Sequence, residues 1–283
     1  MAAIRLIAID IDGTLLNSSF QVSEANRAML ACAHERGIEI ALVTGRRHTF
    51  ALPIAQSLGF AVTLISSNGA VTRSSTGELF HQDQLPQSVA RRLVEYMTNW
   101  RDYLVFTFDR AGRGALVVEK VDELHRSIQR WMEKNAEYIE FVHPIENSLT
   151  ADPIQAMFCS DIARMQEAEA HLRANTALLS SITLLKTQYE ARDLCILDIL
   201  NDGCSKGHAL RRWVEHQGIQ REEVMAIGDN YNDIEMLEFA GLPYLMGNAC
   251  EALRHNGWPL TLCADENGVA HAIAQVLGGN QRR

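Results

Sequence analysis

The sequence lacks the features that mark several classes of protein. No apolar run approaches the roughly 18–20 residues that span a bilayer. The six cysteines are scattered without a C-x-x-C pair, and no two of the ten histidines are spaced H-x-x-x-H. These absences argue against a membrane segment, a disulfide framework and a zinc site. We therefore expect a cytoplasmic protein with buried free thiols and no assigned role for any histidine.

Positive charge is also scarce. The 283 residues carry 26 Lys and Arg against 35 Asp and Glu, a formal net charge of −9. Nucleic-acid binders usually present a basic surface, so we expect no nucleic-acid partner. A small anionic substrate stays open, because one pocket can be positive on an acidic protein. The apolar content of 47% is typical of a globular chain, and the length suffices for about two domains.

Strand and helix signals alternate in the first 70 residues and again after residue 194. Continuous apolar runs are typical of strands buried in a parallel sheet, and the helical stretches between them end near glycine. We predict strands at Arg5–Ile9, Ile38–Val43, Val62–Ser66, Cys195–Leu200, Val224–Ile227 and Leu242–Met246. Helices are predicted at Ser23–Arg36, Thr49–Leu58, Lys206–Gln217 and Asp233–Phe239. This order favours a doubly wound, Rossmann-like α/β fold.

The pattern changes between about Leu85 and Arg192. Amphipathic helices are predicted near Ser88–Thr98, Val121–Lys134 and Ile162–Asn175, and strands at Tyr103–Phe108, Ala115–Val118 and Ile154–Cys159. The simplest account is one core domain split by an insertion. We therefore predict a catalytic core formed by residues 1–84 and 193–283, with an inserted α+β domain at residues 85–192.

The first predicted strand leads into Asp10-Ile11-Asp12-Gly13-Thr14. Residues two apart in extended backbone point to the same side, so Asp10 and Asp12 are expected to face one reacting centre. Ligands bind beyond the carboxyl ends of strands in open α/β sheets. Two carboxylates there suit a hard divalent cation such as Mg²⁺, or a nucleophile with an acid/base partner. The alternative is that both acids merely cap the next turn.

Three later segments also stand at predicted element ends. Thr44-Gly45-Arg46 offers a hydroxyl and a backbone N–H to phosphate oxygens, although a simple strand-to-helix turn has the same pattern. Lys206 begins a helix, where a cation is unfavourable unless an anion is near; the alternative is a solvated lysine. The run Gly228–Asp233 places two acids and two amides after a strand, and its alternative is a polar turn.

These pieces, in the order D-x-D-G-T-L, T-G-R, K-G and G-D-x-x-N-D, resemble the haloacid dehalogenase superfamily, most closely its Cof-type phosphatases. Segments Ser67–Ala70, Met246–Ala249 and Asn267–Val269 are similar to segments of the same branch. The insertion resembles the type II (IIB) α+β cap of those enzymes. The resemblance implies a magnesium-dependent hydrolase acting on a small phosphorylated metabolite, such as a sugar phosphate.

The resemblance also implies roles for individual residues. Asp10 would attack phosphorus and become the aspartyl-phosphate, while Asp12 would protonate the leaving oxygen and then activate water. Mg²⁺ would be bound by the carboxylates of Asp10 and Asp229 and the backbone carbonyl of Asp12. Asp233 would orient the waters of the metal, unless it only caps a helix. The phosphoryl oxygens would be contacted by the Ile11 N–H, Thr44, Gly45, Lys206 and Asn232.

Several questions stay open from the sequence. A phosphomutase also uses a phosphoaspartate, and a binding protein without turnover is a third possibility. Arg46 is expected to form an ion pair on the core surface, with a contact to substrate or cap as the alternative. Asp198 is interpreted as structural. The substrate and the oligomeric state are not indicated, and Arg113, Tyr189 and Arg192 are only candidates for setting specificity.

Overall fold

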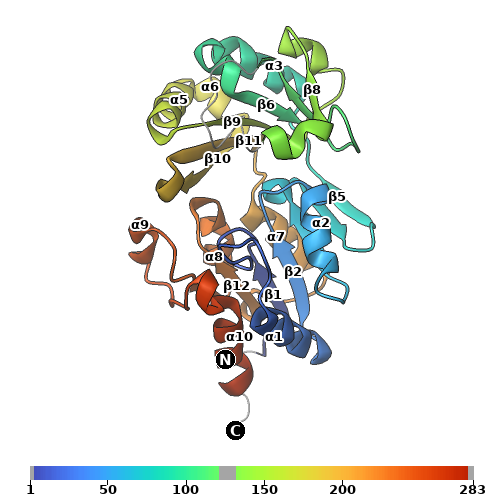
Figure 1. The fold of residues 1–283 in the computed structure, drawn as a ribbon, viewed down its shortest axis with the longest axis vertical. Helices are drawn as coiled ribbons and strands as arrows, with labels where there is room; N and C mark the ends of the chain where they lie inside the picture. Colours follow the sequence, from blue (N-terminus) through green and yellow to red (C-terminus); the bar gives the residue numbers. More distant parts are fainter. Residues whose placement is uncertain (1–2, 121–131, 280–283) are drawn as a thin grey trace. The chain divides into compact units, whose positions relative to one another are not determined.

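The computed structural model describes residues 3–120 and 132–279. The chain divides into two compact units, the first formed by Met1–Gln82 and Ser205–Arg283 and the second by Asp83–Cys204. Both are drawn in Figure 1. Each unit contains one sheet of its own, and each is described separately below.

The first unit contains a seven-stranded sheet in the order β13-β12-β1-β2-β3-β4-β5. The five strands from β13 to β3 run parallel, and β4 and β5 add an antiparallel edge. Its strands are β1 (Leu6–Ile9), β2 (Glu39–Val43), β3 (Thr63–Ser66), β4 (Val71–Ser74), β5 (Leu79–Gln82), β12 (Val224–Gly228) and β13 (Leu242–Leu245). The predicted parallel α/β sheet is confirmed, whereas the β4–β5 hairpin was not predicted.

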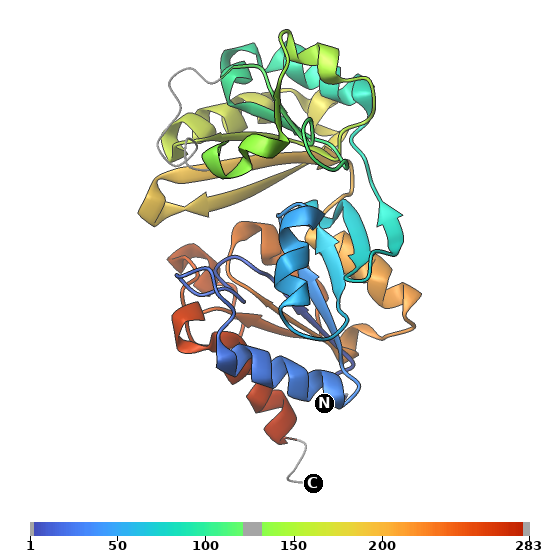
Figure 2. The same cartoon turned by 45° about the vertical axis from the view of Figure 1, so that its right-hand side comes forward.

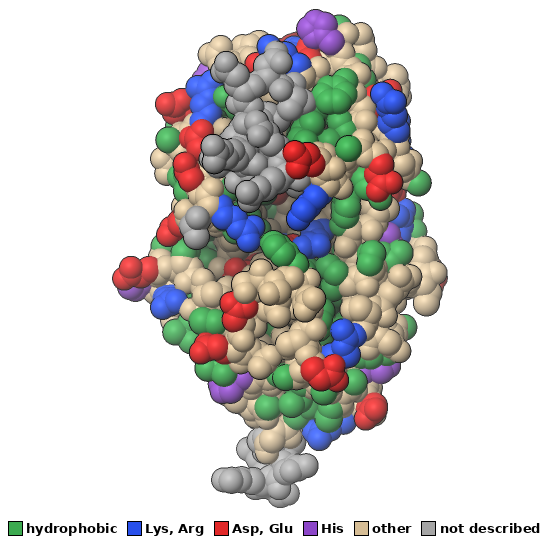
Figure 3. Space-filling view, viewed as in Figure 1, with side chains coloured by type: hydrophobic (Ala, Val, Ile, Leu, Met, Phe, Trp, Pro, Cys, Tyr) green, Lys and Arg blue, Asp and Glu red, His purple; other side chains and the backbone are tan. Residues whose placement is uncertain are grey.

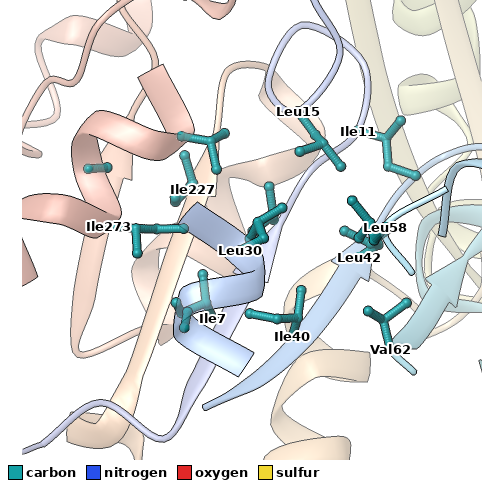
Figure 4. Packing of buried hydrophobic residues seen from close by; sticks show 14 of the residues in the cluster. Ile7, Ile11, Leu15, Leu30, Ile40, Leu42, Leu58, Val62, Ile227 and Ile273 are labelled. Atoms are coloured by element: carbon teal, nitrogen blue, oxygen red, sulfur yellow. The ribbon is translucent and has the colours of Figure 1, made fainter. Parts of the chain in front are cut away.

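Helices cover both faces of this sheet. On one face lie α1 (Glu24–Glu35), α2 (His48–Gln56) and α10 (Gly268–Gly279), and on the other α7 (Lys206–His216), α8 (Ile234–Phe239) and α9 (Glu251–Arg254). Figure 2 shows α1 and α10 side by side, in agreement with their contacts. Leu30 of α1 and Ile273 of α10 pack against Ile7 and Ile227 of the sheet (Figure 4). Each fully buried aliphatic side chain of this kind contributes about 1.5–3 kcal/mol.

The second unit contains a six-stranded sheet in the order β10-β11-β9-β6-β7-β8. Its strand pairs are antiparallel except for β7 with β8. The strands are β6 (Leu104–Thr107), β7 (Leu116–Val118), β8 (Ile139–Phe141), β9 (Gln155–Ser160), β10 (Ile182–Tyr189) and β11 (Leu194–Asn201). One face packs against α3 (Gln87–Tyr96), α5 (Ile162–Ala174) and α6 (Thr176–Leu179). This agrees with the predicted α+β class, although residues 121–131 of one predicted helix lie outside the described residues.

The strand predicted at Cys195–Leu200 lies in the second sheet, so the prediction that it resumes the first sheet is wrong. β11 pairs with β10 and β9, and its inward side chains join the apolar cluster of the second unit. A continuous apolar run looks alike in either sheet, because periodicity does not reveal the pairing partner. The units therefore change between Gln82 and Asp83 and between Cys204 and Ser205, rather than at 84/85 and 192/193.

Three expectations concern the exterior and the thiols. No helix of the described residues is both long and apolar enough to cross a membrane. On the face in Figure 3, both basic and acidic side chains are present, and several of the basic ones lie near one another. All six cysteines are free thiols, but only Cys195 and Cys204 are buried, whereas the other four are partly exposed. The expectation of buried thiols thus holds for two of them.

Candidate active site

The candidate site lies in the first unit, where neighbouring parallel strands end. Asp10 follows β1, Thr44 follows β2 and Asp229 follows β12, and the sheet order places these three strands side by side. Lys206 is the first residue of α7, which packs on one face of the sheet. Four segments that are separate in the sequence therefore meet at the carboxyl ends of the central strands, as the strand-end pattern predicts.

Lys206 is buried between two carboxylates. Its Nζ lies 2.6 Å from Oδ1 of Asp10 and 2.6 Å from Oδ1 of Asp233, and its side chain is 1% exposed. Burial alone would lower the pKa of this lysine, but the two carboxylates outweigh that effect and raise the pKa above its usual value. The ammonium group is therefore a fixed positive charge, and the alternative of a solvated lysine is wrong.

Burial acts in the opposite sense on the acids. It raises the pKa of Asp10 from its ordinary 3.8 to about 7, although Lys206 pulls that pKa down. Burial, followed by the charge of Asp10, also holds the pKa of Asp229 well above its usual range. Both carboxylates thus sit where a further positive charge would stabilise their ionised forms.

The carboxylate of Asp229 is hydrogen-bonded to Thr14 and Asn248, and it lies close to Gly13. Oγ1 of Thr14 donates a hydrogen bond to its Oδ1 at 3.2 Å, and Nδ2 of Asn248 lies 3.4 Å from its Oδ2. The same Asn248 amide donates to the Gly13 carbonyl at 2.8 Å. Gly13 has φ of +84°, and a Cβ there would lie 2.3 Å from Oδ2 of Asp229. Glycine is therefore required at this position both for its backbone conformation and for the approach of the carboxylate.

Asp233 uses both of its carboxylate oxygens. Oδ1 accepts from Lys206, and Oδ2 accepts from the backbone N–H groups of Asp229 and Asn230, each at 3.0 Å. The sequence leaves two roles open for this residue, a cap and a support for the metal site. The capping role is present in the structure, because Asp233 forms a capping box with Asn230. The same bonds fix the turn that carries Asp229.

The acids form a cluster with the dimensions of a cation site. Carboxylate oxygens of Asp10, Asp229 and Asp233 lie within 4.8 Å of one another. When ionised they carry three negative charges, and within the described residues Lys206 supplies one positive charge to them. Oxygen ligands and excess negative charge fit a hard divalent cation. Since Asp233 is fully engaged elsewhere, Asp10 and Asp229 are the members best placed to bind it.

Asp12 belongs to a different environment from Asp10. Strand β1 ends at Ile9 and the chain then turns, so the extended backbone assumed for these two acids is absent. The Asp12 carboxylate accepts two hydrogen bonds from Arg46, from Nε at 2.6 Å and from Nη2 at 2.5 Å, and its side chain is 29% exposed. The ion pair expected for Arg46 therefore exists, and its partner is Asp12.

A third group of residues surrounds the turn after β2. Thr44 is buried, and its Oγ1 accepts from the Arg46 N–H at 3.1 Å. Nδ2 of Asn232 donates to Oδ1 of Asn68 at 2.9 Å. A Cβ on Gly45 would lie 3.1 Å from that same oxygen. Predicted phosphate contacts from two loops, Gly45 and Asn232, therefore meet at Asn68.

The remaining predicted residues are placed less closely. The Ile11 side chain is fully buried in the apolar cluster that α1, α2 and α10 form with the first sheet (Figure 4). Only its backbone is therefore available to a ligand. In the second unit, the Arg192 guanidinium lies 5.5 Å from the centre of the Tyr189 ring, and Arg113 is exposed. A role for these three in specificity stays a prediction.

Three residues of the site, Thr14, Asn68 and Asn248, have no role predicted from the sequence. Asn68 and Asn248 stand in the S-N-G-A and M-G-N-A segments that resemble the Cof-type branch, and Thr14 in the first motif. The signal is thus present as a resemblance. Their hydrogen bonds join residues 164, 215 and 235 positions apart, which no local pattern reveals.

Comparison with known proteins gives the same picture. A family model of haloacid dehalogenase-like hydrolases matches residues 7–273. The phosphatase YwpJ of Bacillus subtilis is 32% identical over 96% of this chain and 100% of its own. The pyridoxal phosphate phosphatase YbhA of Escherichia coli is 29% identical over 88% of this chain and 90% of its own.

A solved structure extends the likeness to three dimensions. A haloacid dehalogenase-like hydrolase from B. subtilis superimposes with a TM-score of 0.79 at 29% identity, over 95% of this chain and 99% of the other. The match spans both units and all four motifs of the site. The chain therefore belongs to the haloacid dehalogenase-like hydrolases, and it is one of the phosphatases of that family.

Proposed function

We propose that this enzyme hydrolyses small phosphomonoesters through an aspartyl-phosphate on Asp10, with Mg²⁺ as cofactor. The observation that carries the proposal is the contrast between two nearby acids. Asp10 is buried against Lys206, whereas Asp12 is partly exposed and paired with Arg46. Two carboxylates in different environments suit two roles, a nucleophile and a general acid/base.

The reaction divides into two displacements at phosphorus. A carboxylate oxygen of Asp10 forms a bond to phosphorus as the bond to the leaving oxygen breaks, and Asp12 gives its proton to that oxygen. Asp12 then takes a proton from water, whose oxygen attacks the same phosphorus. The bond from phosphorus to Asp10 breaks, which restores the carboxylate and releases inorganic phosphate. Positioning and charge neutralisation supply most of the rate in such transfers.

The chain's own groups serve these steps. Lys206 favours the ionised form of Asp10 and supplies positive charge for a phosphoryl group. Thr44, the Gly45 and Ile11 N–H groups and Asn232 are proposed as further donors to its oxygens. The carboxylates of Asp10 and Asp229 and the backbone carbonyl of Asp12 would hold Mg²⁺. When bound, the cation would neutralise negative charge on the phosphoryl group.

The substrate is proposed to be a small metabolite, such as a sugar phosphate or a related compound. Support comes from the relatives, which include a pyridoxal phosphate phosphatase and an HMP-PP phosphatase. Residues 83–204 are assigned the role of the family's cap domain on the resemblance alone. A cap excludes water and large substrates from the chemistry, which favours small molecules over proteins or nucleic acids.

A substrate panel tests the proposal. The purified protein is incubated with Mg²⁺ and a series of phosphorylated metabolites, and free phosphate is measured over many turnovers, with Asp10→Asn as the matched variant. We expect release by the native protein and none by the variant, which still binds the metabolite. Isomerised substrate without free phosphate would indicate a mutase. Binding without any turnover would indicate a sensor, and unchanged release by Asp10→Asn would exclude Asp10 as the nucleophile.

A further inference from the structure

The turn after β3 has an unusual backbone. Ser67, Asn68 and Gly69 have consecutive positive φ angles of 49°, 53° and 105°. L-residues seldom adopt this region, and Asn tolerates it better than most. Such conformations persist where the surroundings fix them, and they cluster at functional sites. Asn68 is also fully buried, so the turn points a polar side chain into the protein.

The backbone of this turn holds the loop after β2. The Asn68 N–H donates to the Thr44 carbonyl at 2.9 Å, and the Ser67 N–H donates to the Arg46 carbonyl at 2.8 Å. These two bonds bracket Gly45, whose N–H is a proposed phosphate contact. The position of the Thr44–Arg46 turn therefore depends on the left-handed conformation of its neighbour.

The side chain of Asn68 reaches a second loop. Its Oδ1 accepts one hydrogen of the Asn232 amide at 2.9 Å. The carboxamide nitrogen of Asn232 carries two hydrogens, and the other one makes no hydrogen bond within the described residues. Oδ1 of Asn68 also lies where a Cβ on Gly45 would approach to 3.1 Å. One buried oxygen therefore binds one of the loops that present donors and lies close to the other.

We propose that Asn68 is a positioning residue for the phosphoryl group, which orients the Asn232 amide and the Thr44–Arg46 turn toward it. The inference rests on the proposed phosphatase function, because it assigns these two loops to the phosphoryl oxygens. Asn68 itself need not touch the substrate. Asparagine suits the position because it accepts a hydrogen bond without a negative charge and tolerates a positive φ.

The choice of variants separates positioning from folding. Asn68→Gly keeps the backbone conformation and removes the oxygen, whereas Asn68→Asp keeps the shape and the acceptor but adds a negative charge near the phosphoryl group. Asn68→Gly therefore tests positioning, because only this variant loses the oxygen that accepts from Asn232. Asn68→Asp keeps that contact and tests how close the position lies to a bound anion. Asn267→Gly is the matched control, since Asn267 also has positive φ, 62°, and lies outside the site.

Calorimetric binding of inorganic phosphate, in the presence of Mg²⁺, is the decisive measurement because it needs no turnover. We expect Asn68→Gly to weaken phosphate binding about three- to tenfold, the fold-change for loss of one ordinary hydrogen bond. Asn68→Asp is expected to weaken it further, and Asn267→Gly to leave it unchanged. In the double variant with Asn232→Ala, the two losses should not add, because Asn68 acts through Asn232.

Two results would overturn the inference: phosphate binding by Asn68→Gly equal to that of Asn267→Gly, or fully additive losses in the double variant. If Asn68→Gly has a lower melting temperature but an unchanged affinity for phosphate, the residue supports only the fold and the inference is overturned. Failure of the proposed function looks different, since the native protein would then release no phosphate from any substrate while its affinity for inorganic phosphate still responded to Asn68.

Discussion

Arg46 holds Asp12 by two parallel hydrogen bonds, from Nε at 2.6 Å and from Nη2 at 2.5 Å. A planar guanidinium fixes both the distance and the orientation of a carboxylate, which the single ammonium group of lysine does not. If Asp12 is the general acid/base, its orientation toward the leaving oxygen depends on this pair.

We therefore predict that Arg46→Lys lowers kcat about tenfold, a part of the 10²–10⁴ that general acid–base catalysis supplies. KM should change less, because substrate binding rests mainly on other groups. Steady-state kinetics with one small phosphomonoester measures both constants. Arg27→Lys is the control, since Arg27 faces Glu24 at 3.9 Å on α1. Equal kcat values for the two variants would contradict the prediction.

Lys206 offers a prediction about stability. Replacing it by methionine leaves Asp10 and Asp233 buried without their shared cation. Breaking a buried ion pair by removing one partner costs about 3–5 kcal/mol. We expect Lys206→Met to lower the free energy of unfolding in urea by that amount in a buffer without divalent cations.

The control is Lys186→Met, because Lys186 is partly exposed and lies 3.5 Å from Glu169. Pairs of this exposure contribute about 0–1 kcal/mol. The loss in Lys206→Met should shrink at lower pH, where the buried acids take up protons. Equal losses in the two variants would mean that the Lys206 charge is not needed by the fold.

The sequence predicts which residues gather at the carboxyl ends of the parallel strands better than it predicts the contacts among their side chains. Asp10, Thr44 and Asp229 each follow a strong apolar strand, and strands of a parallel sheet end on one edge. Their assembly can therefore be expected from the strand pattern alone. The partner of Arg46 and the hydrogen bond from Asn232 to Asn68 cannot, because they depend on side-chain directions across loops.

The second sheet shows a different limit. β11 has the apolar run of a buried parallel strand, but it forms an antiparallel hairpin with β10. The middle of β10 includes Lys186, and only Ile182 and Thr187 of its eight residues are buried. The sequence of such a strand shows little alternation of apolar and polar residues, so it is hard to predict. The predicted boundary between the units therefore falls before β11, whereas the chain returns to the first unit only after it.

The buried acids predict a pH dependence of stability. Burial raises the pKa of Asp10 to about 7, while the unfolded chain ionises near its ordinary 3.8. Between these values the folded chain binds the extra proton, so the contribution of Asp10 to stability falls as pH rises through about 7. Asp229 acts in the same direction. Without divalent cations, the native protein should therefore lose melting temperature relative to Asp10→Asn as pH rises from about 4 to about 7.

Mg²⁺ should reverse this trend. A cation binds the ionised carboxylates, so its binding strengthens as these groups lose protons. Ligands that bind only the folded state raise its melting temperature. We expect the increase caused by Mg²⁺ to be larger at about pH 8 than at about pH 6, on either side of the Asp10 pKa, and to be nearly absent in Asp229→Asn. An increase independent of pH, or retained in that variant, would argue against binding at this cluster.

Asn248 is expected to tune the affinity for Mg²⁺ without binding the ion. Its amide donates to the Gly13 carbonyl at 2.8 Å and lies 3.4 Å from Asp229, while its oxygen accepts from the Ala264 N–H at 2.9 Å. It thereby fixes the chain beside the carboxylate. Loss of such a supporting contact typically weakens metal binding about 10- to 100-fold. We predict a loss of about tenfold for Asn248→Ala, measured by titrating Mg²⁺ against melting temperature.

The control for this last variant is Asn256→Ala, because Asn256 is exposed after α9 and belongs to no part of the site. Phosphate release at saturating Mg²⁺ should recover most of the native rate in Asn248→Ala, since the ligands themselves remain. A rate that stays low at saturating Mg²⁺ would show that Asn248 acts on the chemistry rather than on the affinity for the cation. An Mg²⁺ affinity equal to that of Asn256→Ala would remove the role of Asn248 altogether.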